Sequence, residues 1–173
     1  SHLDGMGLQL LANCDLYACC SPVWSPDGTS IAFINLQDVE VINFNDPSNR
    51  RSVYKLSRSK QEKCSSVKLS WFSDSRRLLV SDGLQIQILD LADHSVDMLF
   101  ELPPETAEGA VLAVVLPDDK YIAYRANYKE ADCDDGLLCF HREIMITNLE
   151  DILWKDITPS FDNRFDLSDF DWQ

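Results

Sequence analysis

Cysteine is the first residue type in this 173-residue sequence that could do chemistry, with six residues. Cys133 and Cys139 enclose a short acidic segment, and a disulfide between them could staple a surface loop. Of the other cysteines, Cys14 could pair with Cys19 or Cys20, and Cys64 has no cysteine near it in the sequence. No two have the C-x-x-C spacing of a zinc site or redox motif, so metal binding by thiolates is not indicated. Free thiols in a reducing compartment are the alternative.

Aspartates are the second candidates, because hard cations such as calcium take several oxygen ligands on a flexible loop. They gather in two groups: Asp132, Asp134 and Asp135, and further on Asp162, Asp166, Asp169 and Asp171. Neither group has the spacing of a calcium-binding helix-loop-helix site, and runs of charge are usually solvated. Calcium is therefore the one cofactor considered, with Asp166, Asp169 and Asp171 as its candidate ligands.

Histidine, the commonest general base, is scarce in this sequence. His2 lies in the opening residues, His94 in an expected turn, and His141 beside a basic residue. A Gly-x-Ser-x-Gly elbow, a His-Glu-x-x-His helix and a phosphate-binding loop are all missing from the sequence. We therefore expect no catalytic residue and no enzyme activity in this chain.

Composition limits the class of protein and of partner. A hydrophobic fraction of 45% is typical of a folded chain, and the length suits one domain. The formal net charge of −14 argues against nucleic acid and anionic membranes as partners, and favours basic proteins or cations. No apolar run is long enough to insert in a bilayer. Residues 1–5 resemble a cloning leader and carry no signal sequence, so the compartment is left unknown.

The elements that must position these residues come from a repeat. Trp24-Ser25-Pro26-Asp27-Gly28 leads into the apolar run at 31–34, and related segments start at Trp71 and Val115. A fourth copy opens at Trp172. A period in the forties, with several short strands in each copy, is typical of a propeller blade. Asp27, Asp74 and Asp118 recur at one position of every copy, which indicates a role in the turn and not in catalysis.

Each copy can be read as four strands with alternating apolar residues. The first strand ends in the motif Trp, the second follows the turn, and the third alternates, as in Leu84–Ile88. The fourth is a half-polar outer strand, expected at 52–56, 96–102 and 153–157. We predict an all-β chain with blades at about 20–57, 66–102 and 110–158, and part of a further blade at 166–173. Residues 6–173 would form one partial propeller domain.

The motif Trp24-Ser25-Pro26-Asp27-Gly28-x-x-Ile31-Ala32-Phe33 closely resembles the repeat of TolB-like β-propellers. The second copy departs from it at Phe72 and Ser75, and the third at Val115 and Asp119. The resemblance implies a scaffold that binds through its rim loops and central channel, in a periplasmic or extracytoplasmic setting. Related propellers belong to peptidases and lyases, whose catalytic groups lie in a separate domain or on several histidines that are absent here.

Three blades cannot close a ring, since propellers contain four to eight. Either the chain is a piece of a longer propeller, or two chains form a six-bladed ring with Leu8–Leu11 and Asp166–Trp172 exchanged at the seams. Open blade faces would be apolar, so self-association is expected in both cases. Trp24, Trp71, Trp172, Phe33 and Tyr124 would form the core between blades.

The third copy carries an insertion at 127–140, and a long loop on a rigid scaffold is usually functional. Tyr128, Leu137, Leu138 and Phe140 combine there with acidic groups, which suits a protein partner. The first hypothesis is a non-catalytic TolB-like propeller module for protein–protein interaction or self-assembly. The alternative is the propeller portion of a hydrolase or lyase whose catalytic part lies outside this chain.

Overall fold

The computed structural model of the chain describes residues 10–13, 19–56, 67–83, 85–101, 112–130, 139–149 and 154–156. These residues form three antiparallel sheets of four strands, each built in chain order, and none of them is helical. The first sheet contains β1 (Cys19–Trp24), β2 (Ser30–Asn35), β3 (Asp38–Asn43) and β4 (Arg50–Lys55). The second contains β5 (Lys68–Trp71), β6 (Arg77–Ser81), β7 (Gln85–Asp90) and β8 (Val96–Glu101). The third contains β9 (Leu112–Val115), β10 (Tyr121–Glu130), β11 (Cys139–Asn148) and β12 (Trp154–Asp156).

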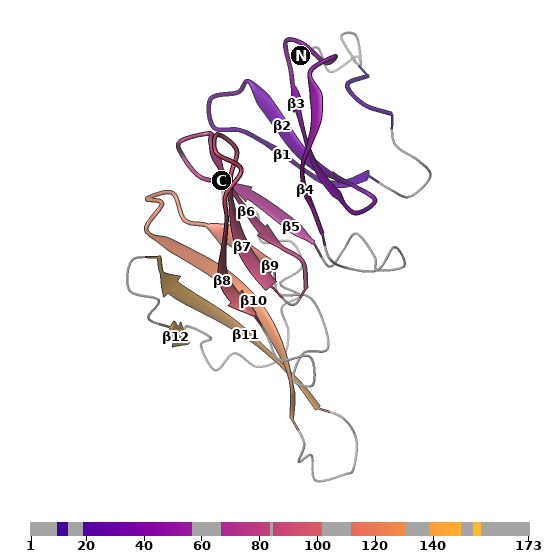
Figure 1. Ribbon diagram of the computed structural model, residues 1–173. Coiled ribbons are helices and arrows are strands. Elements are labelled where there is room, and N and C mark those ends of the chain that lie inside the picture. Colours follow the sequence, from indigo (N-terminus) through magenta and orange to yellow (C-terminus); the bar gives the residue numbers. More distant parts are fainter. Residues whose placement is uncertain are drawn as a thin grey trace, which may run out of the picture.

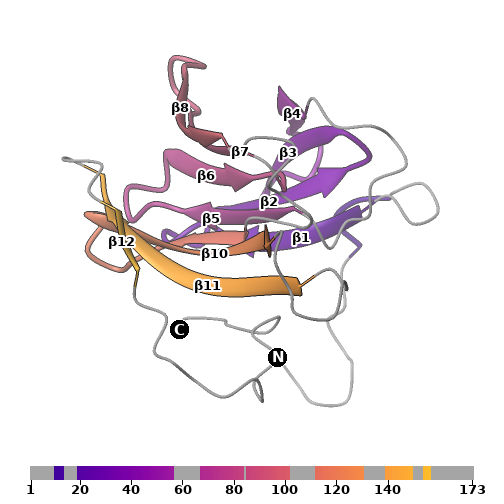
Figure 2. The same ribbon diagram turned by 90° about the horizontal axis from the view of Figure 1, so that it is seen from below.

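The three sheets follow one another as blades, with the second between the other two (Figure 1). The first strands contact one another in order, β1 with β5 and β5 with β9. The outer strands β4 and β8 lie on the side away from β1 and β5 (Figure 2). This is the predicted all-β arrangement of four-stranded antiparallel blades. No helix in the part of the chain that is described could cross a membrane.

One turn recurs between the first two strands of every blade. The N–H of the fifth motif residue donates to the carbonyl three residues earlier, at 2.9 Å for Gly28, 3.1 Å for Ser75 and 3.0 Å for Asp119. All three residues adopt a left-handed backbone, with φ of 71°, 55° and 56°. Glycine suits this conformation, whereas serine and aspartate adopt it at a cost. The turn predicted from Pro26 and Gly28 is therefore present in all three copies.

The apolar core lies between blades, because alternate residues of a strand point to opposite sides of its sheet. In β6, Leu78 and Val80 pack toward the first blade, and Leu79 packs toward the third. We call the side of a blade that packs on the preceding blade its front face, and the opposite side its back face. Each blade thus needs a neighbour on both faces to be fully buried.

The insertion in the third blade differs from the expected loop. β10 and β11 pair in unbroken register from Tyr121–Asn148 to Glu130–Cys139, so the two ends of 127–140, at 127–130 and 139–140, extend a hairpin. Only 131–138 lies between the two strands, outside the described residues. Polar residues such as Lys129 favour a loop by propensity, but pairing with the facing strand satisfies their backbone hydrogen bonds and overrides that preference.

Candidate interaction face on the first blade

An apolar row crosses the front face of the first blade. Trp24 ends β1 and lies opposite Ile31 in β2, which in turn lies opposite Ile42 in β3. Phe33 follows two residues after Ile31 and therefore points to the same side. Ile31, Phe33 and Ile42 are buried as one small cluster. The strand alternation thus places four large apolar side chains on a face that has no blade in front of it.

The second blade shows what the same row does when a blade precedes it. Trp71, the counterpart of Trp24, is only 8% exposed and packs in the core between the first two blades. Its indole Nε1 donates a hydrogen bond of 3.1 Å to the carbonyl of Val23 in the preceding blade. Trp24 is 54% exposed, and its indole N–H has no acceptor among the described residues. The prediction that Trp24 belongs to a core between blades is therefore wrong, because no other blade in the described part of the chain packs on this face. Trp71 and Tyr124 confirm the prediction. Phe33 is buried, but against Leu11 and Ala12 and not between blades, and Trp172 lies outside the described residues.

Phe44, just after β3, enlarges the exposed part of this face. Its ring lies 5.1 Å from the Trp24 ring at an interplanar angle of 58°, a favourable tilted arrangement. Its backbone N–H donates to the carbonyl of Thr29 at 2.8 Å, which fixes the chain beside the turn. Two adjoining exposed aromatic rings on a rigid sheet are typical of a contact surface for another protein.

Residues 10–13 cover the other part of the face. Leu11 and Ala12 pack on the buried cluster, and a cavity of about 250 Å³ remains between this segment and the sheet. The cavity is lined by apolar residues and one cysteine: Leu11, Ala12, Cys20, Pro22, Ile31, Phe33 and Ile42. Arg50 holds the segment by donating from Nη1 to the carbonyl of Asn13 at 3.0 Å. Residues 10–13 thus shield Phe33 from solvent and leave Trp24 and Phe44 exposed.

The charged groups beside this face are paired. Glu40 is buried next to Phe33 and accepts hydrogen bonds from Arg50 and from Asn35 Nδ2, the latter at 2.9 Å. Burial would raise the pKa of Glu40, but the bonds from Arg50 and Asn35 outweigh it, so its pKa lies below its usual value. The Arg50 guanidinium also lies 5.3 Å over the Phe33 ring. This edge therefore offers a neutralised ion pair and a largely apolar surface.

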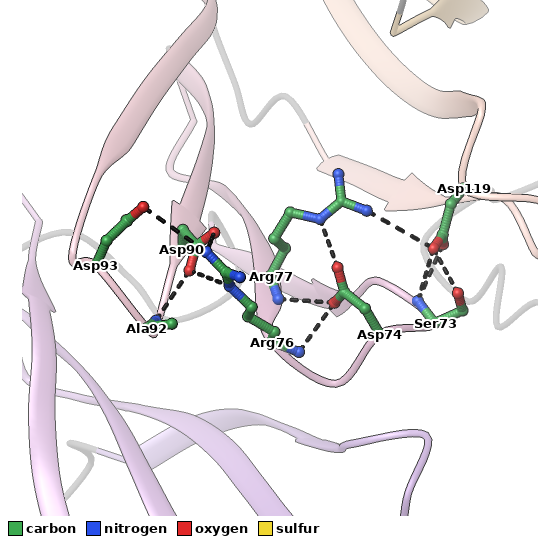
Figure 3. A network of polar contacts seen from close by, with 8 residues as sticks. All are labelled: Ser73, Asp74, Arg76, Arg77, Asp90, Ala92, Asp93 and Asp119. Carbon is green, nitrogen blue, oxygen red and sulfur yellow. Dashed lines mark hydrogen bonds and ion pairs between the residues drawn. The ribbon is translucent and has the colours of Figure 1, made fainter.

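A second group of charges lies at the rim of the second blade (Figure 3). Arg76 forms a two-pronged pair with Asp90, at 2.7 Å from Nε and 2.6 Å from Nη2. Asp90 also accepts from the N–H of Ala92, and the hydrogen bond from Arg76 is the main reason why its pKa is lowered. Asp93 lies 3.7 Å from the same guanidinium. These contacts connect the β6 and β7 ends of the blade, which gives the carboxylates a structural role.

Asp74 closes the neighbouring turn in the same network. It accepts from the backbone N–H groups of Arg76 and Arg77 at 2.9 Å, and from Arg77 Nε at 2.6 Å. Burial tends to raise the pKa of Asp74, but the hydrogen bonds from Arg77 and Arg76 together outweigh burial, so the pKa lies below its usual value. The predicted turn role of Asp27, Asp74 and Asp118 is confirmed, since each accepts a hydrogen bond from a backbone N–H two residues further on.

The fifth motif residue connects one blade to the blade before it. Ser75 Oγ accepts from the N–H of Asp27 at 3.0 Å. The Asp119 carboxylate likewise accepts from the N–H of Ser73 at 3.0 and 3.1 Å (Figure 3). Gly28 occupies this position in the first blade and has no side chain, and a Cβ added to it would meet nothing within 4 Å. No described residue thus fills the space in front of the first blade at the turn or at the exposed part of Trp24.

The remaining predicted site residues lie where their side chains are not described. Tyr128 is in β10, opposite His141, and Phe140 and Cys139 are in β11. Leu137, Leu138, Cys133, Asp166, Asp169 and Asp171 lie outside the described residues. Within the described part of the chain, no group of three potential metal ligands comes together. Cys20 is disulfide-bonded, and the partner is not among the described side chains.

The sequence predicts that open blade faces are apolar, but it does not identify Trp24 and Phe44 as the residues that form the exposed part of such a face. Trp24 belongs to the first copy of the repeat in this sequence, and no described blade packs in front of it. Asp119 was noted only as a departure from the usual glycine. In the structure it is a contact between blades.

Comparisons with known proteins agree with this architecture. No family model matches the chain, and no curated protein matches its sequence significantly. Among solved structures, it is similar to the oligogalacturonate lyase of Vibrio parahaemolyticus, with a TM-score of 0.59 and 11% identity over 84% of this chain and 42% of that one. It is also similar to a putative TolB from Agrobacterium tumefaciens, with a TM-score of 0.56 and 10% identity over 86% of this chain and 51% of that one. These similarities show the fold of TolB-like and related β-propellers. The chain spans about half the length of these solved proteins.

Proposed function

We propose that this chain is a non-catalytic β-propeller module that acts through protein–protein interaction or self-assembly, with the front face of the first blade as its contact surface. The observation that carries the proposal is the contrast between two equivalent residues. Trp71 is buried against the preceding blade, whereas Trp24 is 54% exposed beside the exposed Phe44. A surface built like an internal interface, but left open, is best explained by a partner that covers it.

Two further features support a binding role. The ion pair of Glu40 and Arg50 places no unpaired charge on the face, so a partner could bury it without a large desolvation cost. The carboxylates at the rim of the second blade, such as Asp74 and Asp90, accept hydrogen bonds from backbone N–H groups of turns and thereby stabilise those turns. The face is therefore better suited to packing than to chemistry.

Light scattering over a concentration series tests this proposal. We expect association that increases with concentration, and its loss in a Trp24→Glu variant, because the glutamate would be buried unpaired. Met98→Glu is the matched control, since Met98 is 50% exposed on the outer strand β8 and away from the front face. The proposal fails if the chain is monomeric at all concentrations, or if both variants associate as the parent does.

A further inference from the structure

We propose that the partner is a second copy of this chain, whose third blade packs its back face on the front face of the first blade. This inference rests on the proposed function and names the occupant of the same surface. Two copies would meet at two identical seams and close one six-bladed ring. Trp24 of each copy would then be buried as Trp71 is within the chain.

The acceptor for Trp24 is present on the third blade. Within the chain, Trp71 Nε1 donates to the carbonyl of Val23, which lies opposite Ala32 in the first blade. Val114 occupies the corresponding place in the third blade, opposite Ala123. Since the register is the same, the carbonyl of Val114 is positioned as that of Val23 is. It can accept the indole N–H that Trp24 leaves without a partner.

The apolar surfaces of the two faces also correspond. The back face of the first blade, which packs on the second, carries a cross-strand row of small and branched residues: Val23, Ala32 and Val41. The third blade carries the same row with one change: Val114, Ala123 and Ile146. A front face that carries Trp24, Ile31 and Ile42 therefore meets the kind of surface that Trp71, Leu78 and Leu89 meet within the chain.

The turns of successive blades are also connected by a hydrogen bond, and the turn of the third blade has the donor for one. The N–H of Asp27 donates to the fifth motif residue of the next blade, Ser75. Asp118 is the counterpart of Asp27, and its N–H has no acceptor among the described residues. In the proposed ring it would lie beside Gly28 of the second copy, which cannot accept a side-chain hydrogen bond. The seam between copies is thus predicted to lack one hydrogen bond that each internal seam has.

Blade number favours a second copy over an unrelated partner. Among the described residues, no blade packs on the front face of the first blade or on the back face of the third, so a contact between these two faces repeats until the ring closes. A ring of two copies covers every front face, which an unrelated partner on one face would not.

Cysteine cross-linking across the seam tests the arrangement. A chain carrying Gly28→Cys is mixed with a chain carrying Asp118→Cys, and the mixture is oxidised. Mass spectrometry then identifies the linked peptides and distinguishes this link from disulfides that involve native cysteines. Asp27→Cys with Ser75→Cys in one chain is the matched control, because these residues already make the equivalent contact. We expect a link between copies at a yield comparable with the control. The parent chain should have the mass of a dimer.

The possible failures are distinguishable. Association without the link at the seam would overturn the ring arrangement and leave the proposed interaction face standing. Assemblies larger than a dimer would also overturn the ring. A chain that stays monomeric, with the internal control linked, would overturn both the ring and the self-assembly form of the proposed function.

A gain of affinity provides an independent test at Gly28. Gly28→Ser would supply the hydroxyl that Ser75 supplies within the chain, and Gly28→Ala is the control that carries the same backbone strain without it. We expect the serine variant to dimerise more tightly than the alanine variant, by roughly fivefold per seam and about 25-fold for two seams. Equal dissociation constants for the two variants would show that position 28 does not face a second copy.

Discussion

Replacing Trp71 by phenylalanine probes the contact that defines a blade interface in this protein. The indole is 8% exposed, and its N–H donates at 3.1 Å to the carbonyl of Val23. Phenylalanine keeps an aromatic ring in the core but removes the donor and part of the volume. Trp24→Phe is the matched variant, because the same change at the exposed counterpart removes a donor that has no acceptor in the single chain.

The cost of Trp71→Phe follows from two contributions. Loss of the hydrogen bond costs about 1 kcal/mol, and the unfilled volume left by the smaller ring costs on the order of 1 kcal/mol more. The free energy of unfolding should therefore fall by about 2 kcal/mol, which lowers the melting temperature by roughly 4–8 °C in a domain of this size. For Trp24→Phe we expect a change within about 0.5 kcal/mol in the monomer, as for other exposed substitutions.

Urea unfolding followed by circular dichroism, at concentrations where light scattering gives a monomer, measures both values. Circular dichroism is preferred because fluorescence would report the substituted tryptophans themselves. Equal losses for the two variants would refute the reasoning, since they would mean that Trp24 is already packed as Trp71 is. No loss for Trp71→Phe would show that the bond to Val23 does not stabilise the interface between blades.

Three further predictions follow from the contacts between blades and from the charge. Asp119→Ala should lower the free energy of unfolding by about 2 kcal/mol, because it removes the acceptor for the backbone N–H and the hydroxyl of Ser73 and places alanine in a left-handed backbone. Asp119→Asn should cost less than about 1 kcal/mol. Thermal unfolding measures both variants, and equal costs would contradict the role of the carboxylate. Sedimentation should show tighter association as sodium chloride rises, because each chain carries a formal charge of −14 that salt screens, and weaker association would instead indicate ion pairs across the seam. The folded chain holds the pKa values of Asp74 and Glu40 below their unfolded values, so on acidification the unfolded state takes up protons first. The stability that these carboxylates contribute is therefore complete above about pH 4–5 and is lost as the pH falls through their folded pKa values. Urea titrations at several pH values should show this decline, and Asp74→Asn should make it shallower.

The local structure was predictable because its causes lie close together in the sequence. The apolar run at 31–34 lies within β2, and the alternation before Ile88 lies within β7. The turn chemistry of Asp27 was also predictable, since its carboxylate accepts from Ser25 and Thr29, both two residues away. Period-2 alternation and turn residues act over a few positions, so one sequence is enough to recognise them.

The interaction face depends on contacts that the local pattern does not contain. Trp24 and Trp71 have the same place in the motif, and only the presence of a preceding blade makes one buried and the other exposed. The contact of Asp119 with Ser73 likewise depends on how two sheets stack. The pairing of Lys129 with Phe140 at the ends of the insertion likewise depends on the facing strand, because lysine alone does not favour a strand.

The most direct test of the interaction face is fluorine NMR of the chain labelled with 5-fluorotryptophan, with the Trp24 and Trp71 signals assigned through their phenylalanine variants. The solvent isotope shift of the Trp24 signal reports whether water reaches its ring. As the protein concentration rises and the chain associates, we predict that this shift disappears for Trp24 and stays small throughout for Trp71. A Trp24 ring that remains exposed to water in the associated protein would contradict the account.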